Sequence, residues 1–439
     1  MELQEKFLHH IWDQRHLIHE LKTVSGKAVK IVYQGQYNTA NGPDFKNAII
    51  SIDGENLQGD VEIHQKTYDW TAHQHDEDPA YNSTILHVVM EHRSSMAVTI
   101  REDAKPIEIL EIKDQIDADI AKLFAVFQET KDKPRKGLCD FFKLSSNEQL
   151  ILLLKSYGWE RFVRKVSRYN AELLFNSFEQ LLYNGIMEAM GYDKNKSNTL
   201  LIAHNFPWDK LCRWNQQGLD TTSLAAIWLN YADLFPKAEK LLPNELVQHL
   251  KQAFELQSFT TEKSALRWNL FRIRPANHPV KRIIQAAILV SNMQDKGLLK
   301  PLENILSFET DKPLKMLSAR FSELFCPVDE HLNLIEKPGK TFILTIIGNV
   351  MLPILHLYSD KTNNTELKKN IRQLFMGFPP LQDNYITSFM KGYLDDEQWQ
   401  LINDNYACQQ GLMNVYFSFC IYCLCELCKA DRQRCLTNL

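Results

Sequence analysis

Side chains that can bind metals or transfer protons are concentrated between residues 42 and 66 of this 439-residue sequence. Asp44 stands at the head of one expected strand, and Glu62 and His64 lie near the end of the next. Side chains point alternately to the two faces of a strand, so Asp60, Glu62 and His64 share one face. Burying three such groups is costly unless they are paired or bind a metal. This stretch is therefore where we expect catalysis.

Metal-dependent cleavage of a phosphodiester needs oxygen ligands for Mg²⁺ or Mn²⁺ and a group that positions or deprotonates the attacking water. Asp44 and Glu62 supply carboxylates for the ion. His64 and Lys66 follow Glu62 on the same face, so either could orient the water. We predict a metal site at Asp44 and Glu62, with His64 or Lys66 acting in catalysis. The alternative is that the two acids only cap and pair with groups inside a small sheet.

Alternating strand patterns surround these residues. An amphipathic helix is expected over residues 3–21, where apolar side chains recur at helical spacing, and Ser25-Gly26 should end it. The turn dipeptides Asn41-Gly42 and Asp53-Gly54 separate neighbouring strands. Residues 66–82 show no alternation and should form a helix or loop. The expected strands cover residues 28–33, 45–52, 59–64, 84–91, 96–100 and 106–112.

Helical patterns dominate from about residue 114 onward. The charged connector Lys131–Gly137 contains proline and glycine and is a plausible boundary. We therefore expect a multidomain α+β protein, with a mixed-sheet α/β domain over residues 1–125. A large all-α domain with a cysteine-rich C-terminal segment should cover residues 126–439. Its clearest helical patterns cover residues 150–169, 171–190, 222–231, 246–256, 280–290, 341–357 and 412–427.

The order of one helix, three strands, a helical crossover and a further strand resembles the PD-(D/E)xK nuclease superfamily. Pro43-Asp44 precedes one strand and Glu62-x-His64 ends the next, as that resemblance requires. The superfamily normally carries lysine two residues after its acidic ligand, where His64 stands in this chain. The resemblance implies a nuclease-like fold, Mg²⁺ or Mn²⁺ as cofactor, and nucleic acid as the partner.

A second resemblance covers nearly the whole chain. The pattern GxxNxxxGPDFxxAxI from Gly35, followed by GDVEIH, DWxxHxH, DxxYN and ILHVV, is similar to a family of uncharacterised bacterial proteins, domain of unknown function 2851. RPANHPVKR (Arg274–Arg282) and QGLMNVY (Gln410–Tyr416) extend the likeness into the helical part. This resemblance implies that the two parts of the chain belong together, and it implies no activity.

Two histidines in DWTAHQHDED form a second candidate group. On a strand, His73 and His75 would share a face in the manner of a transition-metal site, whereas on a helix they would diverge by about 200°. They either touch the active metal or substrate, or lie in a polar loop beside it. His87 is interpreted as a core histidine or, alternatively, as a functional one.

Two groups of basic residues could bind phosphates. The first has spacing i, i+3, i+4 and i+7, which forms one stripe on a helix, although such stripes are often solvated surfaces. It consists of Arg161, Arg164, Lys165 and Arg168. Arg274 and Arg282 flank a proline loop and could clamp an anion, or could be buried in pairs between helices.

Cysteines cluster near the end of the sequence, where Cys420, Cys423, Cys425 and Cys428 give C-x2-C-x-C-x2-C. Four thiolates suffice for zinc or an iron–sulfur cluster, but buried free cysteines on an apolar helix are the alternative. The family resemblance suits the set Cys139, Cys420, Cys425 and Cys428, which would tie the connector to the C-terminus.

The amino-acid composition excludes few classes of function. The formal net charge of −4 provides no global attraction for nucleic acid, so such binding needs a local basic patch. The charged N-terminus has no apolar core of a signal peptide, and the longest apolar run, residues 342–357, is interrupted by Gly348, Asn349 and Pro353. We expect a cytoplasmic protein with no membrane partner.

The leading expectation is thus a metal-dependent nuclease whose helical domain grips nucleic acid. The alternative is a non-catalytic nucleic-acid-binding or scaffold protein that keeps a nuclease-like fold, which the missing lysine two residues after Glu62 favours. A third hypothesis is a Zn²⁺ hydrolase built on His73, His75 and Asp78.

Overall fold

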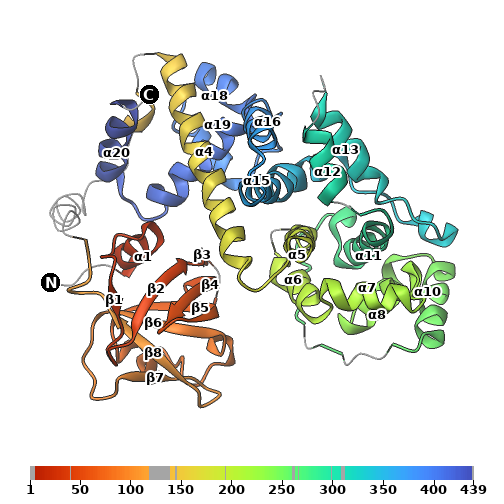
Figure 1. The fold of residues 1–439 in the computed structure, drawn as a ribbon, viewed down its shortest axis with the longest axis horizontal. Helices are drawn as coiled ribbons and strands as arrows, with labels where there is room; N and C mark the ends of the chain where they lie inside the picture. The colour runs from red at the N-terminus through yellow and green to blue at the C-terminus, as the bar shows by residue number, and fades with distance from the viewer. Residues whose placement is uncertain are drawn as a thin grey trace. The chain divides into compact units, whose positions relative to one another are not determined.

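The computed structural model describes residues 5–39, 41–117, 139–143, 146–192, 194–259, 263–264, 266–297, 299–307 and 312–437 (Figure 1). The chain divides into two compact units. The sheet unit comprises Met1–Ala171, Asp383–Asp404 and Cys408–Leu439, and the helical unit comprises Glu172–Gln382 and Asn405–Ala407. The expected connector at 131–137 and the predicted boundary at 125 lie outside the described residues.

One mixed sheet forms the N-terminal part of the sheet unit, with strand order β1-β2-β4-β5-β6-β8-β7 and β3 paired to β4. Strands β2, β4 and β5 run antiparallel, whereas β5, β6 and β8 run parallel. A mixed sheet followed by helices confirms the expected α+β organisation. The strands are β1 (Leu21–Lys22), β2 (Ala28–Tyr33), β3 (Gln36–Tyr37), β4 (Phe45–Ile52), β5 (Glu55–Lys66), β6 (Thr84–Glu91), β7 (Val98–Ile100) and β8 (Pro106–Glu111).

The hairpin between β4 and β5 carries the stretch singled out in the sequence. Asp53 and Gly54 adopt φ values of 49° and 86°, which matches the backbone of the tight hairpin turns that Asp-Gly favours. Strand β5 is longer than the expected 59–64, and its buried part begins at Asp60. Strands β2, β4 and β6 have the predicted bounds.

Helix α1 (Glu5–Gln14) covers one face of this sheet through Phe7, Leu8, Ile11 and Trp12, which pack against side chains that include Val61 and Ile63 of β5. The expected helix over 3–21 was too long. Arg15 takes φ of 56° and donates to Val32 O, Leu17 forms a bridge with Ile116, and Leu21 pairs with Val29 in the sheet. Strand pairing therefore overrides the helical spacing after residue 14.

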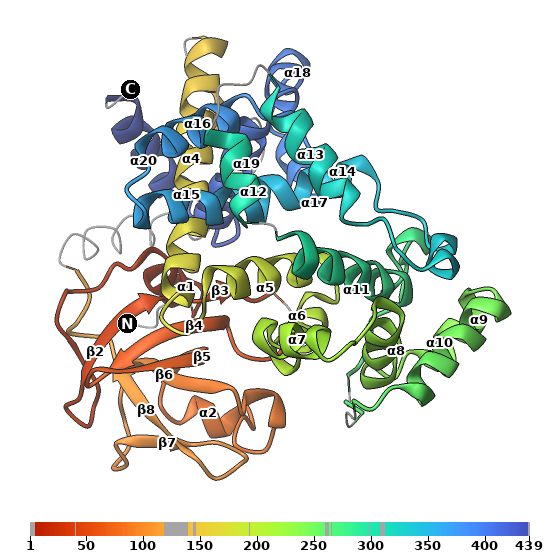
Figure 2. The same cartoon turned by 45° about the vertical axis from the view of Figure 1, so that its right-hand side comes forward.

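The segment after β5 covers the opposite face, where Glu62 and His64 lie. It contains α2 (Asp69–Ala72) and the short 3-10 helix η1 (Pro79–Tyr81), as the absence of alternation predicted. Trp70 and Tyr81 pack with Ile107 of β8 in a small core of their own. Figure 2 shows α2 beside β6 and β8, on the other side of the sheet from α1.

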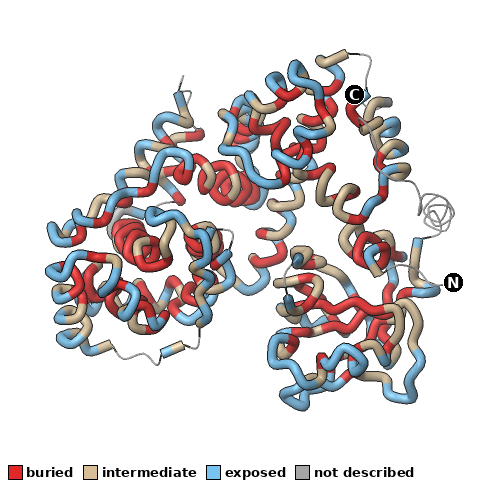
Figure 3. The backbone as a smooth tube through the Cα atoms, turned by 180° about the vertical axis from the view of Figure 1, so that it is seen from behind, coloured by how far each residue is buried: buried red, intermediate tan, exposed pale blue. Residues whose placement is uncertain are grey.

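Helices make up most of the other described residues of both units, and Figure 3 shows buried residues along the strands and along these helices. The sheet unit contains or shares α4 (Asn147–Glu172), α17 (Tyr385–Lys391), α18 (Asp396–Asn403), α19 (Tyr406–Val415) and α20 (Cys425–Thr437). The helical unit contains α5 (Phe178–Met190), α6 (Lys196–Asn205), α7 (Trp208–Gln216), α8 (Thr221–Tyr231), α9 (Phe235–Leu241), α10 (Asn244–Leu256), α11 (Pro279–Lys296), α12 (Leu299–Ser307), α13 (Pro313–Glu323), α14 (Lys340–Ile346), α15 (Leu352–Lys361) and α16 (Thr365–Met376).

Two expected helices contain irregular turns. The apolar pattern at 341–357 continues through Gly348 and Pro353 as α14, a π-helical turn (Ile347–Met351) and α15. The expected continuous helix over 412–427 was wrong, because a π-helical turn follows α19 and Cys423 adopts φ of 63° before α20 begins.

The helical stretch Lys340–Lys361 is long and apolar enough to cross a membrane by length and composition. Its most apolar window has a mean hydropathy of 1.7, and 78% of that window is buried inside the protein. Such burial is equally typical of the core helix of a globular unit.

Candidate metal centre

Asp44 and Glu62 contact each other across the β4–β5 ladder. Phe45 pairs with Val61 in the antiparallel register, which places Asp44, just before β4, next to Glu62. The Asp44 main-chain N–H donates to Glu62 Oε2 at 2.9 Å, and the Ile63 N–H donates to Asp44 Oδ2 at 3.0 Å. The fold thus brings together the two acids that the sequence proposed as metal ligands.

Helix α1 adds two groups that the sequence analysis missed. His9 Nε2 lies 3.2 Å from Asp44 Oδ2, and potential ligand atoms of Glu5, His9 and Asp44 all lie within 4.8 Å of one another. Glu5 and His9 are four residues apart and therefore share one face of the helix. That spacing was the available signal, but only packing of α1 over the sheet brings this face to Asp44.

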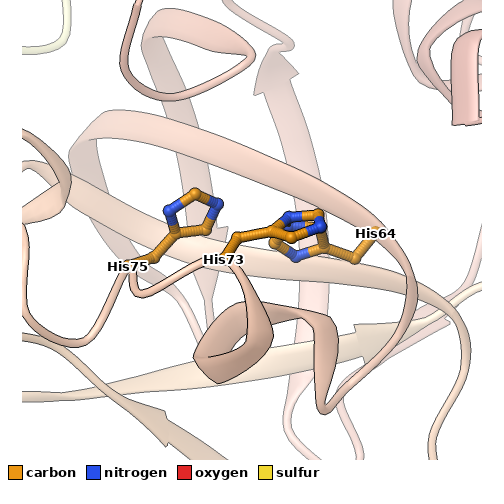
Figure 4. A group of neighbouring side chains, drawn as sticks. All are labelled: His64, His73 and His75. Atoms are coloured by element: carbon orange, nitrogen blue, oxygen red, sulfur yellow. The ribbon is translucent and has the colours of Figure 1, made fainter.

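Three imidazoles gather on the other side of Glu62. Ligand atoms of His64, His73 and His75 lie within 4.8 Å of one another, and in the view of Figure 4 the ring of His73 overlaps that of His64 while the ring of His75 lies to their left. His64 Nε2 lies 3.2 Å from His73 Nδ1 and 3.5 Å from Glu62 Oε1. His75 Nε2 lies 3.3 Å from Glu62 Oε1. His73 and His75 therefore belong to the same centre as the acidic pair.

The loop between β5 and η1 positions these two histidines. The Asp69 carboxylate accepts from the Lys66 N–H at 2.9 Å where α2 begins, and Gln74 takes φ of 61° between the two histidines. His73 and His75 lie beyond the end of α2, so the divergence expected on a helix does not apply. Asp78 caps η1 by accepting from the Ala80 N–H, which gives its carboxylate a structural role.

The His75 ring packs against an aromatic ring. Its imidazole stacks on Tyr81 with ring centroids 3.8 Å apart and planes at 22°. The side chain is only 10% exposed. Stacking and burial fix the ring with Nε2 directed at Glu62.

Two successive hydrogen bonds fix the orientation of the His64 ring. His64 Nδ1 lies 2.9 Å from His87 Nε2, and His87 Nδ1 lies 2.8 Å from Thr99 Oγ1. Both histidines are buried, so neither ring can satisfy these nitrogens with bulk water. His87 is thus a core histidine, as one interpretation of the sequence held, and it also orients His64.

Burial shifts the pKa values of two side chains at this centre. Burial, together with the charge of Asp44, raises the pKa of Glu62 to about 9. Burial and the neighbouring imidazoles of His87 and His75 lower the pKa of His64 to about 2. These shifts keep a proton on Glu62 and leave His64 neutral at pH 7. Binding of a divalent cation at this centre would require Glu62 to lose that proton.

The Lys66 ammonium group contacts Tyr68. Its Nζ donates to Tyr68 Oη at 3.3 Å and sits 5.6 Å from the centre of the Tyr68 ring. Of the two candidates for orienting water, His64 is the one beside Glu62.

The basic stripe on α4 makes contacts inside the sheet unit. Arg161 and Lys165 both donate to Gln410 Oε1, at 3.2 and 3.0 Å, and Arg164 donates to Gln14 Oε1 at 2.6 Å. In addition, the Arg161 guanidinium lies over the Phe417 ring. These residues stabilise packing between helices of the unit.

The two arginines beside the proline loop of the helical unit differ in exposure. Arg282 is 3% exposed, lies 3.9 Å from the centre of the Phe342 ring and donates to Asn277 Oδ1 and Gln285 Oε1. Arg274, before the 3-10 helix Pro275–Asn277, is exposed. Arg274 is therefore the member of this group that an anion can reach.

The four cysteines suggested as a second metal site lie in one part of the sheet unit. Cys428 is buried, and burial together with the nearby Cys420, Cys139 and Cys425 raises the pKa of its thiol. Among the described residues, however, no three cysteine sulfurs lie within 4.8 Å of one another. A third group of possible ligands is His249, Asp329 and His331 in the helical unit.

Comparison with known proteins gives a family and no activity. The model of a family described as "Protein of unknown function (DUF2851)" matches residues 5–384. Neither the curated proteins nor the solved structures include a match to the chain.

Proposed function

This chain belongs to the DUF2851 family, proteins of unknown function, and we propose that its sheet unit is a divalent-metal-dependent nuclease that hydrolyses phosphodiester bonds. The observation that carries the proposal is the contact of Asp44 and Glu62 across the β4–β5 ladder. Each carboxyl group accepts a main-chain N–H from the neighbouring strand region, and a cation beside them would offset the cost of burying the Glu62 carboxylate in its charged form.

The order of elements supports the same proposal. Helix α1 is followed by the antiparallel strands β2, β4 and β5, then by α2 and by β6, which runs parallel to β5. The acids stand at the head of β4 and in β5, as the likeness to PD-(D/E)xK nucleases requires. With 380 residues in the family match, from 5 to 384, the sheet and most of the helical unit occur together.

The chemistry follows from the ligands. Asp44 and Glu62 would hold Mg²⁺ or Mn²⁺, which polarises a phosphoryl oxygen and lowers the pKa of a bound water. Hydrolysis would then consist of attack by water on phosphorus, with its proton passing to solvent, and breakage of the bond to the leaving oxygen, which would take up a proton from solvent. His9, which lies beside Asp44, or His64, which lies beside Glu62, would contact the attacking water under this proposal.

A non-catalytic role in binding nucleic acid is the second candidate. One observation favours it: the position two residues after Glu62 carries His64, whose Nδ1 is occupied by His87, rather than a lysine. Under this proposal the centre would bind a metal and nucleic acid without cleaving it.

Incubation with single- and double-stranded DNA and RNA, in Mg²⁺ or Mn²⁺, separates these functions. We expect the full chain to cleave at least one substrate and Glu62→Gln to lose about 100-fold or more in rate, since even outer-shell changes at metal sites cost about 10- to 100-fold. Asp53→Asn, in the hairpin turn of the same two strands, is the matched control. Binding without cleavage would support the second candidate. If the full chain neither binds nor cleaves any of these nucleic acids, both candidate functions are overturned.

A further inference from the structure

We propose that His64, His73 and His75, together with Glu62, form a binding site for a transition-metal dication of the Zn²⁺ class. This proposal depends on the proposed function in one respect only: Glu62 is a ligand both in the nuclease centre and in the histidine site. The centre would then have two ion positions, one beside Asp44 and one among the histidines. The position among the histidines would bind a different class of metal from the position beside Asp44.

The spacing of the ligand atoms fits one small ion. Ligands about 2.0–2.1 Å from a tetrahedral Zn²⁺ lie about 3.3–3.4 Å from one another. The measured separations are 3.2 Å for His64 Nε2 to His73 Nδ1, 3.3 Å for His75 Nε2 to Glu62 Oε1, and 3.5 Å for His64 Nε2 to Glu62 Oε1. Each of these three contacts therefore has the spacing of two ligands of one ion, and the three histidines also offer ligand atoms that lie within 4.8 Å of one another.

The two oxygens of Glu62 face different sides of the centre. Oε1 faces His64 and His75, whereas Oε2 accepts from the Asp44 N–H. A carboxylate in this position can contact an ion among the histidines and an ion beside Asp44. Glu62 is thus the link between the two metal positions.

Hydrogen bonds behind the ligands select the nitrogen that would bind. If His64 donates its Nδ1 proton to His87 Nε2, then His87 donates its own Nδ1 proton to Thr99 Oγ1. This arrangement leaves the lone pair of His64 Nε2 directed at His73 and Glu62. Metal-binding histidines are typically fixed by such a partner on the second ring nitrogen.

Solvent can reach the site from one side. His64 and His75 are buried, but His73 is exposed. An entering ion can therefore be captured by His73 first, and a water molecule can complete its coordination. Imidazole nitrogens suit Zn²⁺, Co²⁺, Ni²⁺ or Cu²⁺, whereas Mg²⁺ prefers oxygen ligands, so the histidine position should discriminate against Mg²⁺.

Without an ion, the same side chains satisfy one another. Each neutral imidazole can donate one hydrogen bond and accept another, as the contact of His64 with His73 shows. A purely structural cluster of histidines is therefore the competing account. It predicts no affinity for metal at these residues.

Titration of the metal-free full chain with Co²⁺ tests the site, because tetrahedral Co²⁺ absorbs visible light and thiolate ligands add a separate near-ultraviolet band. We expect one Co²⁺ to bind with a nitrogen-type spectrum and Zn²⁺ to displace it. His73→Asn should weaken binding by about 10-fold or more. His73 is exposed, so this variant should fold, as its circular dichroism would verify.

Matched variants identify the site. His331→Asn alters the separate group in the helical unit, and Asp44→Asn alters only the acidic side, so both should retain the Co²⁺ spectrum. If His73→Asn and His75→Asn bind Co²⁺ as tightly as the wild type, the proposal is overturned. A spectrum dominated by thiolate and unchanged in His73→Asn would assign the ion to the cysteines and overturn it as well.

The same variants separate this site from the proposed nuclease. Loss of cleavage in Asp44→Asn with an intact Co²⁺ spectrum supports both. A wild type that binds Co²⁺ through the histidines but cleaves no nucleic acid keeps the site and removes the nuclease. Cleavage in Mg²⁺ by a chain that never binds Co²⁺ at His73 keeps the nuclease and removes the site.

Discussion

The Asp44 N–H donates to Glu62 Oε2 at 2.9 Å, while the Asp44 side chain accepts from the residue after Glu62. Hydrogen bonds across the β4–β5 pairing therefore fix both carboxyl groups, that of Asp44 just before β4 and that of Glu62 within β5. A site built on strands is held more rigidly than one built on connecting segments. This rigidity is why binding of a cation should leave the sheet unchanged.

Binding of Mn²⁺ should stabilise the protein through these two residues. A ligand at 100 times its dissociation constant adds about 2.7 kcal/mol to the stability of the folded state. We expect the melting temperature of the metal-free chain to rise on addition of Mn²⁺ and Asp44→Ala to abolish most of that rise. An equal rise in Asp44→Ala, measured by differential scanning fluorimetry, would place the ion elsewhere.

Glu62 should make the stability of the metal-free protein fall as the pH rises. Its pKa is about 9 in the folded chain and near 4.5 when unfolded, so between these values the folded state binds more protons. Stability from this group is present below pH 4.5 and is lost as the pH approaches 9. Glu62→Gln should flatten that dependence, which urea unfolding at pH 6, 7 and 8 would reveal. Parallel pH profiles of the two proteins would contradict this prediction.

Buried histidines should destabilise the protein in acid. The pKa of His64 is lowered to about 2, and those of His10 and His87 to about 3, chiefly by burial. Because the unfolded chain protonates near pH 6.5 and the folded chain does not, stability is lost as the pH falls below 6.5. Each group contributes about 1.4 kcal/mol per pH unit. A denaturation midpoint constant from pH 7 to pH 5 would be inconsistent with three neutral buried imidazoles.

Thr99→Val should weaken Co²⁺ binding at the histidine site, although it changes none of the proposed metal ligands. The substitution leaves His87 Nδ1 without the Thr99 hydroxyl and costs about 1–3 kcal/mol of stability. It should also lower Co²⁺ affinity by about 10- to 100-fold, the usual effect of losing a partner behind a ligand.

Thr84→Val on β6 is the control for that experiment. Thr84 is fully buried, and its hydroxyl has no partner among the described residues. Removing this hydroxyl should leave Co²⁺ affinity unchanged and should be neutral or stabilising. Equal losses of affinity in the two variants would show that any change in the sheet, rather than the hydrogen bond to His87, is responsible.

The local sequence pattern was sufficient to predict the bounds of strands in which the buried and exposed residues can be recognised from the sequence itself. The strands β2, β4 and β6 have the predicted bounds because apolar alternation and turn residues mark both of their ends. Helix α1 was predicted too long because its apolar spacing continues into residues that pair as β1 and as a bridge to Ile116. The bridge from Leu17 to Ile116 joins residues far apart in the sequence, and the pairing of Leu21 with Val29 is part of the sheet, so neither follows from the helical spacing of residues 3–21.

The candidate site was only partly accessible from the sequence for the same reason. Asp44 and Glu62 meet through a short hairpin, which turn chemistry predicts. Glu5 and His9 reach Asp44 only after α1 packs on the sheet, and Thr99 reaches His87 only through the pairing of β7, β8 and β6. The convergence of His73 with His64 depends on the turn at Gln74.

The most direct measurement is an anomalous difference map from a crystal of the full chain soaked in Mn²⁺. We expect a peak within about 2.0–2.6 Å of a carboxylate oxygen of both Asp44 and Glu62, and its disappearance in Asp44→Asn. A map with no peak at this position, or with a peak that contacts neither carboxylate, would contradict the metal centre and the nuclease built upon it.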